Sequence, residues 1–471
     1  MRRKRNNQLE FDFQPSNLKV TNEYYARYER ISKILDRHPE IVGEIHKDLE
    51  KILKRKQRGG PGRKCGVTSD TVLRIVVCQI LEGEPLRGIV IRIDDSNFLR
   101  RFVRIYNAAM IDFTTLCTLK NAIAAKTWKR VNDLLTRAAI EEEAISGERL
   151  RLDTTVYETN IGWPTDSRLL WDTYRVLSRL IKEVREIDPE VAADKRLQAK
   201  KAKRLYTKIA RRSGKKGVVS QEVKCMYISL IRLVDRLFGW LPSVCERLRV
   251  GLAANTYGFM ESYVVQDVIE QLEHFGSLGF KVTEQAKRRV VDGEAVPNDE
   301  KLFSIFEPHT ELLKRGKAGK PIEFGHMISI QQVEEKFITD YGVFEKKPVD
   351  HTLVDGALSS HRRIFGENPR EFSADKGFYE SMAKINQLEE RIEVVSIAKQ
   401  GKRTEEQTSR EKSKSFKLGQ RFRAGVEGSI SFLKRALGLW RCLNKGWDHY
   451  TSTVGATVFV HNLLVFERGY G

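Results

Sequence analysis

The first third of the chain has apolar residues at helical spacing. A helix is expected from about residue 23 to 54, followed by the basic, glycine-rich turn "RKQRGGPGRK", which indicates a hinge or a phosphate contact. Residues 69–145 are expected to form short helices, of which the first ends at Gly83 and a later one begins after Asp112. This cluster is compatible with a helix-turn-helix, although small helical bundles of other function have the same pattern.

The hydrophobic pattern changes to a period of two at "ERLRLDTTVYETN". Leu150, Leu152, Thr154 and Val156 fall on one face, and Asp153 falls on the other. This alternation predicts a strand with an acid at its middle.

The remaining pattern is helical from residue 165 to about 293 and mixed after that. The stretch "PIEFGHMISIQQVEEKFITDYGVFE" alternates twice, which predicts a β-hairpin. A helix from about 351 to 365, the strand "REFSADKGF", the helix "YESMAKINQLEERI", the strand "EVVSIA", a basic loop over 399–417 and a last helix follow. Strands that alternate with helices after an antiparallel start predict an α/β fold with a mixed sheet.

Composition narrows the class of protein. The 471 residues include 83 Lys and Arg against 63 Asp and Glu, a net charge of +20, and this excess favours a polyanionic partner such as nucleic acid. No membrane span and no signal peptide are expected, which places the protein in the cytoplasm or a nucleus. The six cysteines form no CxxC pair, which argues against a disulfide framework and against a structural zinc site.

One segment of the helical middle region is unusually basic. Residues 195–216 carry eleven Lys and Arg and no acid, including Lys200, Lys201, Lys203 and Arg204. A solvated helix normally mixes both signs of charge. The pattern therefore favours contact with a phosphate backbone, against the alternative of a merely soluble surface.

The last helix, "FRAGVEGSISFLKRALG", aligns charge beside its apolar stripe. Arg423, Glu427 and Lys434 share a narrow arc, because offsets of four and seven residues return almost to the starting direction. Intrahelical ion pairs on a solvated face are the simpler explanation.

Three acids occupy places from which they can converge on one site. Asp153 lies mid-strand, Asp375 ends the fourth strand and Glu427 is on the last helix. Three carboxylates suit a two-Mg²⁺ phosphoryl-transfer site, because these cations take hard oxygen ligands. An exposed strand acid and a turn-forming aspartate are the alternatives for the two aspartates. Four other acids could also replace members of the set: Asp340, Asp355, Glu158 and Asp166.

The motifs resemble those of bacterial insertion-sequence transposases with a DDE triad. "LRLDTTVYETNIGWPTDSRLL" resembles the first-aspartate strand and "FSADKGFY" the second-aspartate segment. "RAGVEGSISFLK" resembles the core of the C-terminal YREK signature, with Arg423, Glu427 and Lys434 at its spacing. "PNDEKLFSIFEPHTELLKRGKAGKPIEFGH" further resembles the ISNCY group.

The resemblance implies a domain organisation. A ribonuclease-H-like α/β catalytic domain with a mixed sheet would comprise residues 146–165 and 294–471, interrupted by a helical insertion over 166–293. An all-α, helix-turn-helix-like DNA-binding region would occupy residues 1–145.

The resemblance also implies an activity. A transposase of this type binds the terminal inverted repeats of its element in double-stranded DNA, cleaves them with two Mg²⁺ ions, for which Mn²⁺ can substitute, and joins the 3′-hydroxyl strand to target DNA. Asp153, Asp375 and Glu427 would be the catalytic metal ligands, while Arg423 and Lys434 would hold DNA phosphates. A homodimer in the synaptic complex, no membrane partner and a cytoplasmic, nucleoid-associated location in a bacterium are implied as well.

Two departures from the family pattern limit these implications. Gln420 stands where the signature has tyrosine, so the role of the tyrosine cannot be transferred. The interval from Asp153 to Asp375 is long, and nothing indicates the role of the helical block within it. A nuclease of the same fold and a DNA-binding regulator with inert acids are the rival hypotheses. Trp163, Trp171 and Trp240 could contact single-stranded ends, although core positions are expected for each.

Overall fold

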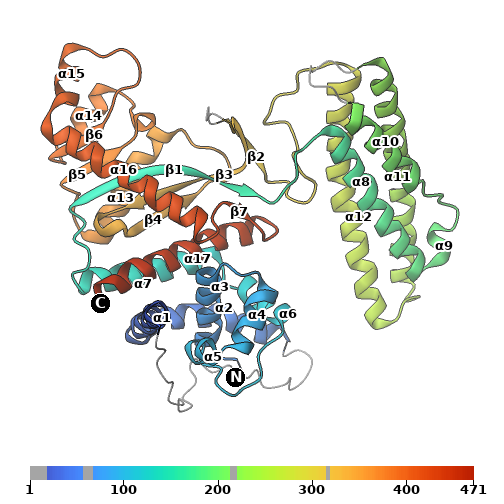
Figure 1. Ribbon diagram of the computed structural model, residues 1–471. Helices are drawn as coiled ribbons and strands as arrows, with labels where there is room; N and C mark the ends of the chain where they lie inside the picture. Colours follow the sequence, from blue (N-terminus) through green and yellow to red (C-terminus); the bar gives the residue numbers. More distant parts are fainter. Residues whose placement is uncertain (1–17, 57–66, 213–219, 315–318, 471) are drawn as a thin grey trace. The chain divides into compact units, whose positions relative to one another are not determined.

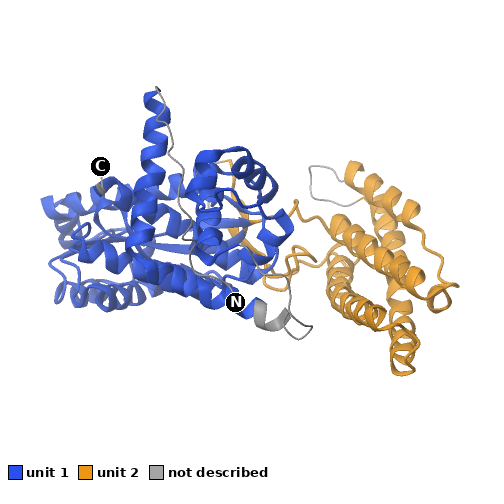
Figure 2. Ribbon diagram, turned by 90° about the horizontal axis from the view of Figure 1, so that it is seen from below, with its two compact units in different colours: residues 1–158, 325–471 blue, residues 159–324 orange. Residues whose placement is uncertain are grey.

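The computed structural model describes residues 18–56, 67–212, 220–314 and 319–470. The chain forms two compact units (Figure 2): unit 1 comprises residues 1–158 and 325–471, and unit 2 comprises residues 159–324. The basic leader and most of the turn "RKQRGGPGRK" lie outside the described residues. The domain boundaries proposed from the sequence stay predictions.

Unit 1 begins with seven helices (Figure 1): α1 (Lys19–Arg37), α2 (Pro39–Lys56), α3 (Ser69–Glu82), α4 (Leu86–Asp95), α5 (Asn97–Phe102), α6 (Phe113–Asn121) and α7 (Ala125–Glu141). Gly83 ends α3 with a φ of 65°, and the Asp112 side chain caps α6, as expected. The single helix expected over 23–54 is wrong, because Pro39 holds the preceding residue out of the helical region and starts a second helix.

The sheet is mixed, which confirms the α/β prediction. Its strands are β1 (Arg149–Thr159), β2 (Glu311–Lys314), β3 (Ile322–Gln332), β4 (Ile338–Val343), β5 (Glu371–Ala374), β6 (Val394–Ile397) and β7 (Arg441–Cys442). The main path is β2-β3-β1-β5-β6, while β4 pairs with β3 and β7 pairs with β1. β1 is antiparallel to β3 and parallel to β5, and β3 and β4 form the expected hairpin.

The later helices of unit 1 are α13 (Leu353–Phe365), α14 (Met382–Glu389), α15 (Glu405–Lys412), α16 (Lys414–Arg435) and α17 (Trp447–Phe466). The loop expected over 399–417 is wrong: it contains α15 and the first turn of α16. A capping box between Thr404 and Gln407 starts α15, and this signal was hidden in a run of charged residues.

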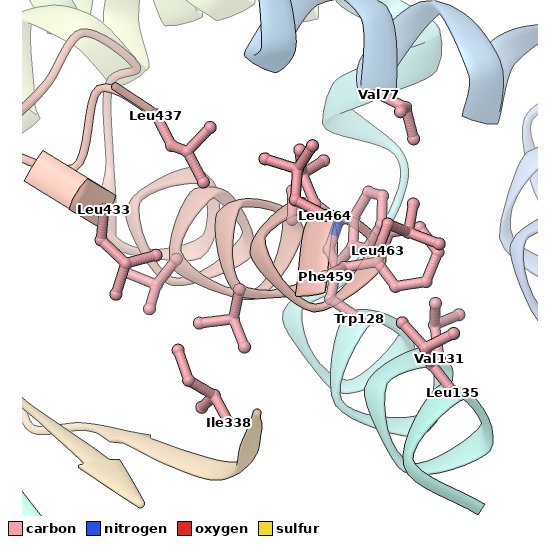
Figure 3. Packing of buried hydrophobic residues seen from close by; sticks show 14 of the residues in the cluster. Val77, Trp128, Val131, Leu135, Ile338, Leu433, Leu437, Phe459, Leu463 and Leu464 are labelled. Carbon is pink, nitrogen blue, oxygen red and sulfur yellow. The ribbon is translucent and has the colours of Figure 1, made fainter. Parts of the chain in front are cut away.

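Helix α17 was missed from the sequence, although it is central to the core of unit 1. Residues 454–464 are buried on all sides of the helix, and its polar and apolar side chains are not segregated, so they form no stripe of the kind that marks a surface helix. Phe459 and Leu463 of α17 pack with Trp128 and Val131 of α7 (Figure 3). The same core includes Leu150 and Leu152 of β1, so α7 and α17 help to hold the strand that carries Asp153.

Unit 2 is mainly a helical bundle with a core of its own. Its helices are α8 (Asp166–Ile187), α9 (Pro189–Ala192), α10 (Ala199–Arg212), α11 (Gln221–Ala253) and α12 (Phe259–Ala286), which continues as a π-helical turn, Lys287–Val291. The helical character expected over 165–293 is confirmed for its described part. Strand β2 lies between the predicted helical region and the predicted hairpin, where the sequence pattern predicts no strand. Trp163, for which a core position was expected, is 64% exposed.

Two further expectations concern cysteines and membranes. Of the described cysteines, which form no disulfide, Cys78, Cys245 and Cys442 are buried, Cys117 is partly buried and Cys225 is exposed. No helix within the described ranges is long and apolar enough to cross a bilayer.

Candidate active site

Asp153 and Asp375 occupy corresponding positions on neighbouring parallel strands. The register pairs Leu152 of β1 with Ala374 of β5, so the two aspartates are the next residues along each chain. β1 continues past Asp153, which is mid-strand as predicted, whereas β5 ends at Ala374. Open α/β sheets bind ligands outside the carboxyl ends of their parallel strands, and Asp375 lies at such an end.

Helix α16 covers the face of the sheet to which Asp153 belongs. The Arg151 guanidinium donates from Nη1 to the Phe422 carbonyl at 2.6 Å and from Nε to Gln332 Oε1 at 2.8 Å. It also lies 4.5 Å from the centroid of the Phe422 ring. Because side chains two residues apart on a strand point to the same face, Asp153 faces α16 as Arg151 does.

Arg151 is a buried cation that fixes this helix on the sheet. Burial, followed by repulsion from Arg149, lowers the pKa of Arg151 to about 10, so the group remains charged at neutral pH. Its donors are used by the Phe422 carbonyl and the Gln332 amide oxygen, as a buried guanidinium requires. A Cβ added at Gly425 would lie 2.2 Å from Arg151 Nη1, so α16 approaches β1 closely only because residue 425 is glycine.

Gln420 shows which side of α16 faces the strand ends. Its Nε2 donates to the carbonyl of Ala374 at 3.2 Å and to the carbonyl of Ser396 in β6. The first carbonyl belongs to the residue immediately before Asp375. Glu427 follows seven residues later, two helical turns on, and therefore lies on the same side of α16 as Gln420.

The side chains of Arg423, Glu427 and Lys434 on that helix differ in their partners and in their exposure. Arg423 Nη2 lies 3.1 Å from Glu427 Oε1, and the Glu427 side chain is 64% exposed. The intrahelical ion pair considered as the simpler explanation is thus present. Such a pair stabilises a helix by only about 0.2–0.5 kcal/mol, so Glu427 can exchange Arg423 for another cation at little cost. Lys434 is in the last turn of α16 and is partly buried.

Asp350 is a neighbouring acid that sequence reasoning missed. It begins the 3-10 turn Asp350–Thr352, and its Oδ1 accepts from the Thr154 hydroxyl at 3.3 Å. A Cβ placed on Gly377 would lie 2.9 Å from Asp375 Oδ1 and 3.0 Å from Asp350 Oδ2, so both carboxylates line the space beside Gly377. The only sequence signal was an acid before a helix, which is also the signature of a helix start.

The four acids that could have replaced members of the triad are each engaged elsewhere. Asp340 pairs with Lys129, Asp355 with Lys384, Glu158 with Arg441 and Asp166 with Arg289. Each has a cation within salt-bridge distance, as Glu427 does, so the ion pairs alone do not separate these acids from the triad. The matched register of β1 and β5 is what favours Asp153 and Asp375 over them.

The donor atoms suit a hard divalent cation in their chemistry, because carboxylate oxygens are the ligands that Mg²⁺ takes. Asp153 and Asp375 follow paired residues of β1 and β5, and Asp350 lies with Asp375 beside Gly377. Within the described part of the chain, however, no group of three or more His, Cys, Asp or Glu could hold a metal ion. The third carboxylate, Glu427, is on the helix above and pairs with Arg423.

The basic segment of unit 2 forms α10, and its last residues, 213–216, lie outside the described part. Ala202 and Ile209 face the bundle, which leaves the charged residues on the outside. Arg212 pairs with Glu222 of α11. No described acid lies within salt-bridge distance of four exposed cations: Lys200, Lys201, Lys203 and Arg204. This surface therefore has the unneutralised charge that a phosphate backbone attracts.

Comparison of the chain with known protein families, with curated proteins and with solved structures found no match.

Proposed function

We propose that this chain is a transposase of the DDE class, which binds the ends of its element, cleaves DNA phosphodiester bonds and transfers the 3′-hydroxyl strand to target DNA. The observation that carries the proposal is the matched position of Asp153 and Asp375 on parallel strands, beneath a helix that carries Arg423, Glu427 and Lys434. This arrangement supplies carboxylates at a strand end and cations on the helix beside them.

The sheet supports the finer fold proposal, a ribonuclease-H-like domain. A long first strand has an antiparallel hairpin on one side and two short parallel strands on the other, with helices in the connections. Unit 2 is inserted between β1 and β3, where the sequence also proposed an insertion. The helix-turn-helix role of the first helices remains part of the proposal.

The residues of the site have distinct roles in this proposal. Asp153, Asp375 and Glu427 would hold the two Mg²⁺ ions, with the Asp375 carboxylate oriented by the Gly377 N–H, which donates to Oδ1 at 2.6 Å. When bound, such ions activate an attacking water or hydroxyl and stabilise the leaving oxygen. Arg423 and Lys434 would bind phosphates of the transferred strand, while Gln420 anchors the helix to the ends of β5 and β6.

The basic face of α10 would supply affinity without sequence preference. Lys200, Lys201, Lys203 and Arg204 would contact backbone phosphates, which position DNA but do not read its bases. The proposed partners are the terminal inverted repeats and target DNA, bound by a homodimer.

The test is a reaction of the purified full chain with labelled DNA that carries the ends of its element. Cleaved and joined products are scored with Mg²⁺, with Mn²⁺ and with a chelator. Joined products that require the metal support a transposase. Nicks without joining would favour a nuclease of the same fold.

A DNA-binding regulator is the second candidate. The Arg423–Glu427 ion pair and the lack of a closed three-carboxylate cluster among the described residues favour it. Binding of the ends without cleavage under every metal condition would establish this candidate over the transposase.

A further inference from the structure

A hollow of about 200 Å³ lies between α13 and α14 of unit 1. Its apolar lining comes from Leu358, Leu388 and Ile392, which also belong to or border the core. Its polar lining consists of charged groups and side-chain amides from both helices and the segments that follow them. A concave site with an apolar base and a few convergent polar groups is the usual form of a ligand site.

The charge of this hollow is positive and only partly neutralised. Its one acid, Asp355, is held by Lys384, whose Nζ lies 2.8 Å from both carboxylate oxygens. Arg362 and Arg391 line the same hollow, and no acid within the described ranges lies at salt-bridge distance from either. Two exposed arginines thus line a small volume whose acid, Asp355, is already paired with Lys384.

The hydroxyl of Ser359 and the amide side chains of Asn368 and Gln387 also line the hollow, and Arg362 Nη2 donates to Ser359 Oγ at 3.3 Å. Two carbonyls at the nearby helix ends already have donors: Gly366 N–H donates to the Arg362 carbonyl at 2.8 Å, and Ile392 N–H donates to the Leu388 carbonyl at 3.0 Å.

We infer that this hollow binds a phosphate group, with Arg362 and Arg391 as its main ligands. Guanidinium donors match phosphate oxygens in pairs, and an anion removes the repulsion between the two cations. The phosphate is either a phosphodiester of the DNA backbone or a phosphomonoester such as a free nucleotide, since both present the same oxygens. The inference does not depend on the proposed catalytic function.

The first experiment measures the Tm of the full chain against inorganic phosphate, with chloride at matched ionic strength as the reference. The variants are Arg362→Gln/Arg391→Gln and, as a matched control, Arg370→Gln, an exposed arginine that pairs with Glu393 outside the hollow. We expect Tm to rise with the logarithm of phosphate concentration in the wild type and the control, and to lose this dependence in the double variant.

An equal phosphate response in the double variant and the wild type would overturn the inference. The single variant Arg391→Gln is measured as well, in case the double variant misfolds. It should fold as the wild type does, because this exposed side chain has no described ion pair to lose. It is expected to weaken the phosphate response, and an unchanged response would also count against the site.

The second experiment distinguishes the two sources of phosphate. Binding to a duplex without element ends is measured over a range of salt concentrations. If DNA fills the hollow, the double variant lowers the slope of log K against log salt by ~0.9 for each backbone phosphate that it no longer neutralises. An unchanged slope, in a variant that no longer responds to inorganic phosphate, identifies a phosphomonoester site.

Discussion

The two units hold positive charge in different ways. Near the strand ends of unit 1 these cations have side-chain partners: Arg149 pairs with Glu371, Arg151 bonds the buried Gln332 and Arg423 pairs with the exposed Glu427. On α10 of unit 2 the cations Lys200, Lys201, Lys203 and Arg204 are exposed, with no acid at salt-bridge distance among the described residues.

This difference separates two kinds of contribution to the binding of a polyanion. A cation held by buried partners acts at one position, so its replacement changes geometry and chemistry. Exposed cations on a helix act through their summed field, so each replacement has a small and salt-dependent effect. Variants at these two kinds of position should therefore differ in the size and the salt dependence of their effects.

The largest effect is expected at the strand ends. Asp153→Asn should lower Mg²⁺-dependent cleavage by more than about a hundredfold, since loss of even an outer partner of a metal site costs 10–100-fold. Binding of end-bearing DNA should be retained. Single-turnover cleavage and a binding titration measure the two quantities, with Glu393→Gln on the exposed Arg370 pair as the control. Equal rates for the two variants would remove Asp153 from the site.

A fall in pH should lower the stability of unit 1. Burial lowers the pKa of His461 on α17 from 6.5 to about 4. Below pH 6.5 the unfolded chain binds a proton that the folded chain excludes, so the free energy of unfolding should fall by on the order of 3 kcal/mol as pH drops towards 4. Hydrogen exchange of α17 amides should speed up more than exchange in α11, which has no histidine. Burial also lowers the pKa of His361 in the same unit to about 4, so His461→Asn should remove part of this pH dependence. An unchanged slope in His461→Asn would assign the dependence elsewhere.

Two glycines of α16 provide an internal contrast. Gly425→Ala places a methyl group against the pinned Arg151 guanidinium and should cost about 1–3 kcal/mol of stability. Gly428→Ala meets no atom within 4 Å and should stabilise the helix by up to ~1 kcal/mol. Denaturant unfolding measures both changes. If Gly425→Ala were as harmless as Gly428→Ala, the close contact between α16 and β1 would be refuted.

The smallest effect per residue is expected on α10. Replacing Lys200, Lys201, Lys203 and Arg204 by glutamine should reduce the salt slope of DNA binding by up to ~0.9 for each phosphate contact and leave the fold intact. The double variant Lys203→Gln/Arg204→Gln should do about half as much. Arg232→Gln/Arg236→Gln, on exposed positions of α11, is the matched control. If the salt slope of DNA binding in the fourfold variant equals that of the wild type, these cations of α10 do not contact DNA and form only a solvated surface.

Most elements of the sheet could be predicted because their patterns are local. The alternation around Asp153 and in the hairpin after Pro321 places an apolar side chain at every second residue, and this local period of two predicts a strand although β1 and β3 are largely buried on both faces. Helix α17 could not be found in this way, since it is buried on every side and has no stripe. The short strand β2 could not be found for a different reason: it lies in a polar segment without alternation.

The candidate site could be predicted only in part. Asp153 and Asp375 could be proposed from their strands, but their matched register depends on a pairing between residues more than two hundred positions apart. Asp350 had no distinguishing motif, and it adjoins Asp375 only because two 3-10 turns meet. Gln420 was interpreted as a departure from a signature, whereas the structure gives it hydrogen bonds to the ends of β5 and β6.

We propose that α16 presents Glu427 to the strand ends as a member of one catalytic site. This proposal can be tested by comparing the wild type with Glu427→Gln on labelled end-bearing DNA in Mg²⁺, with binding, cleavage and joining scored in the same samples. We expect the variant to bind the ends and neither to cleave nor to join them. Cleavage by Glu427→Gln at the wild-type rate would remove Glu427 from the site and leave the Arg423–Glu427 pair as a feature of helix stability alone.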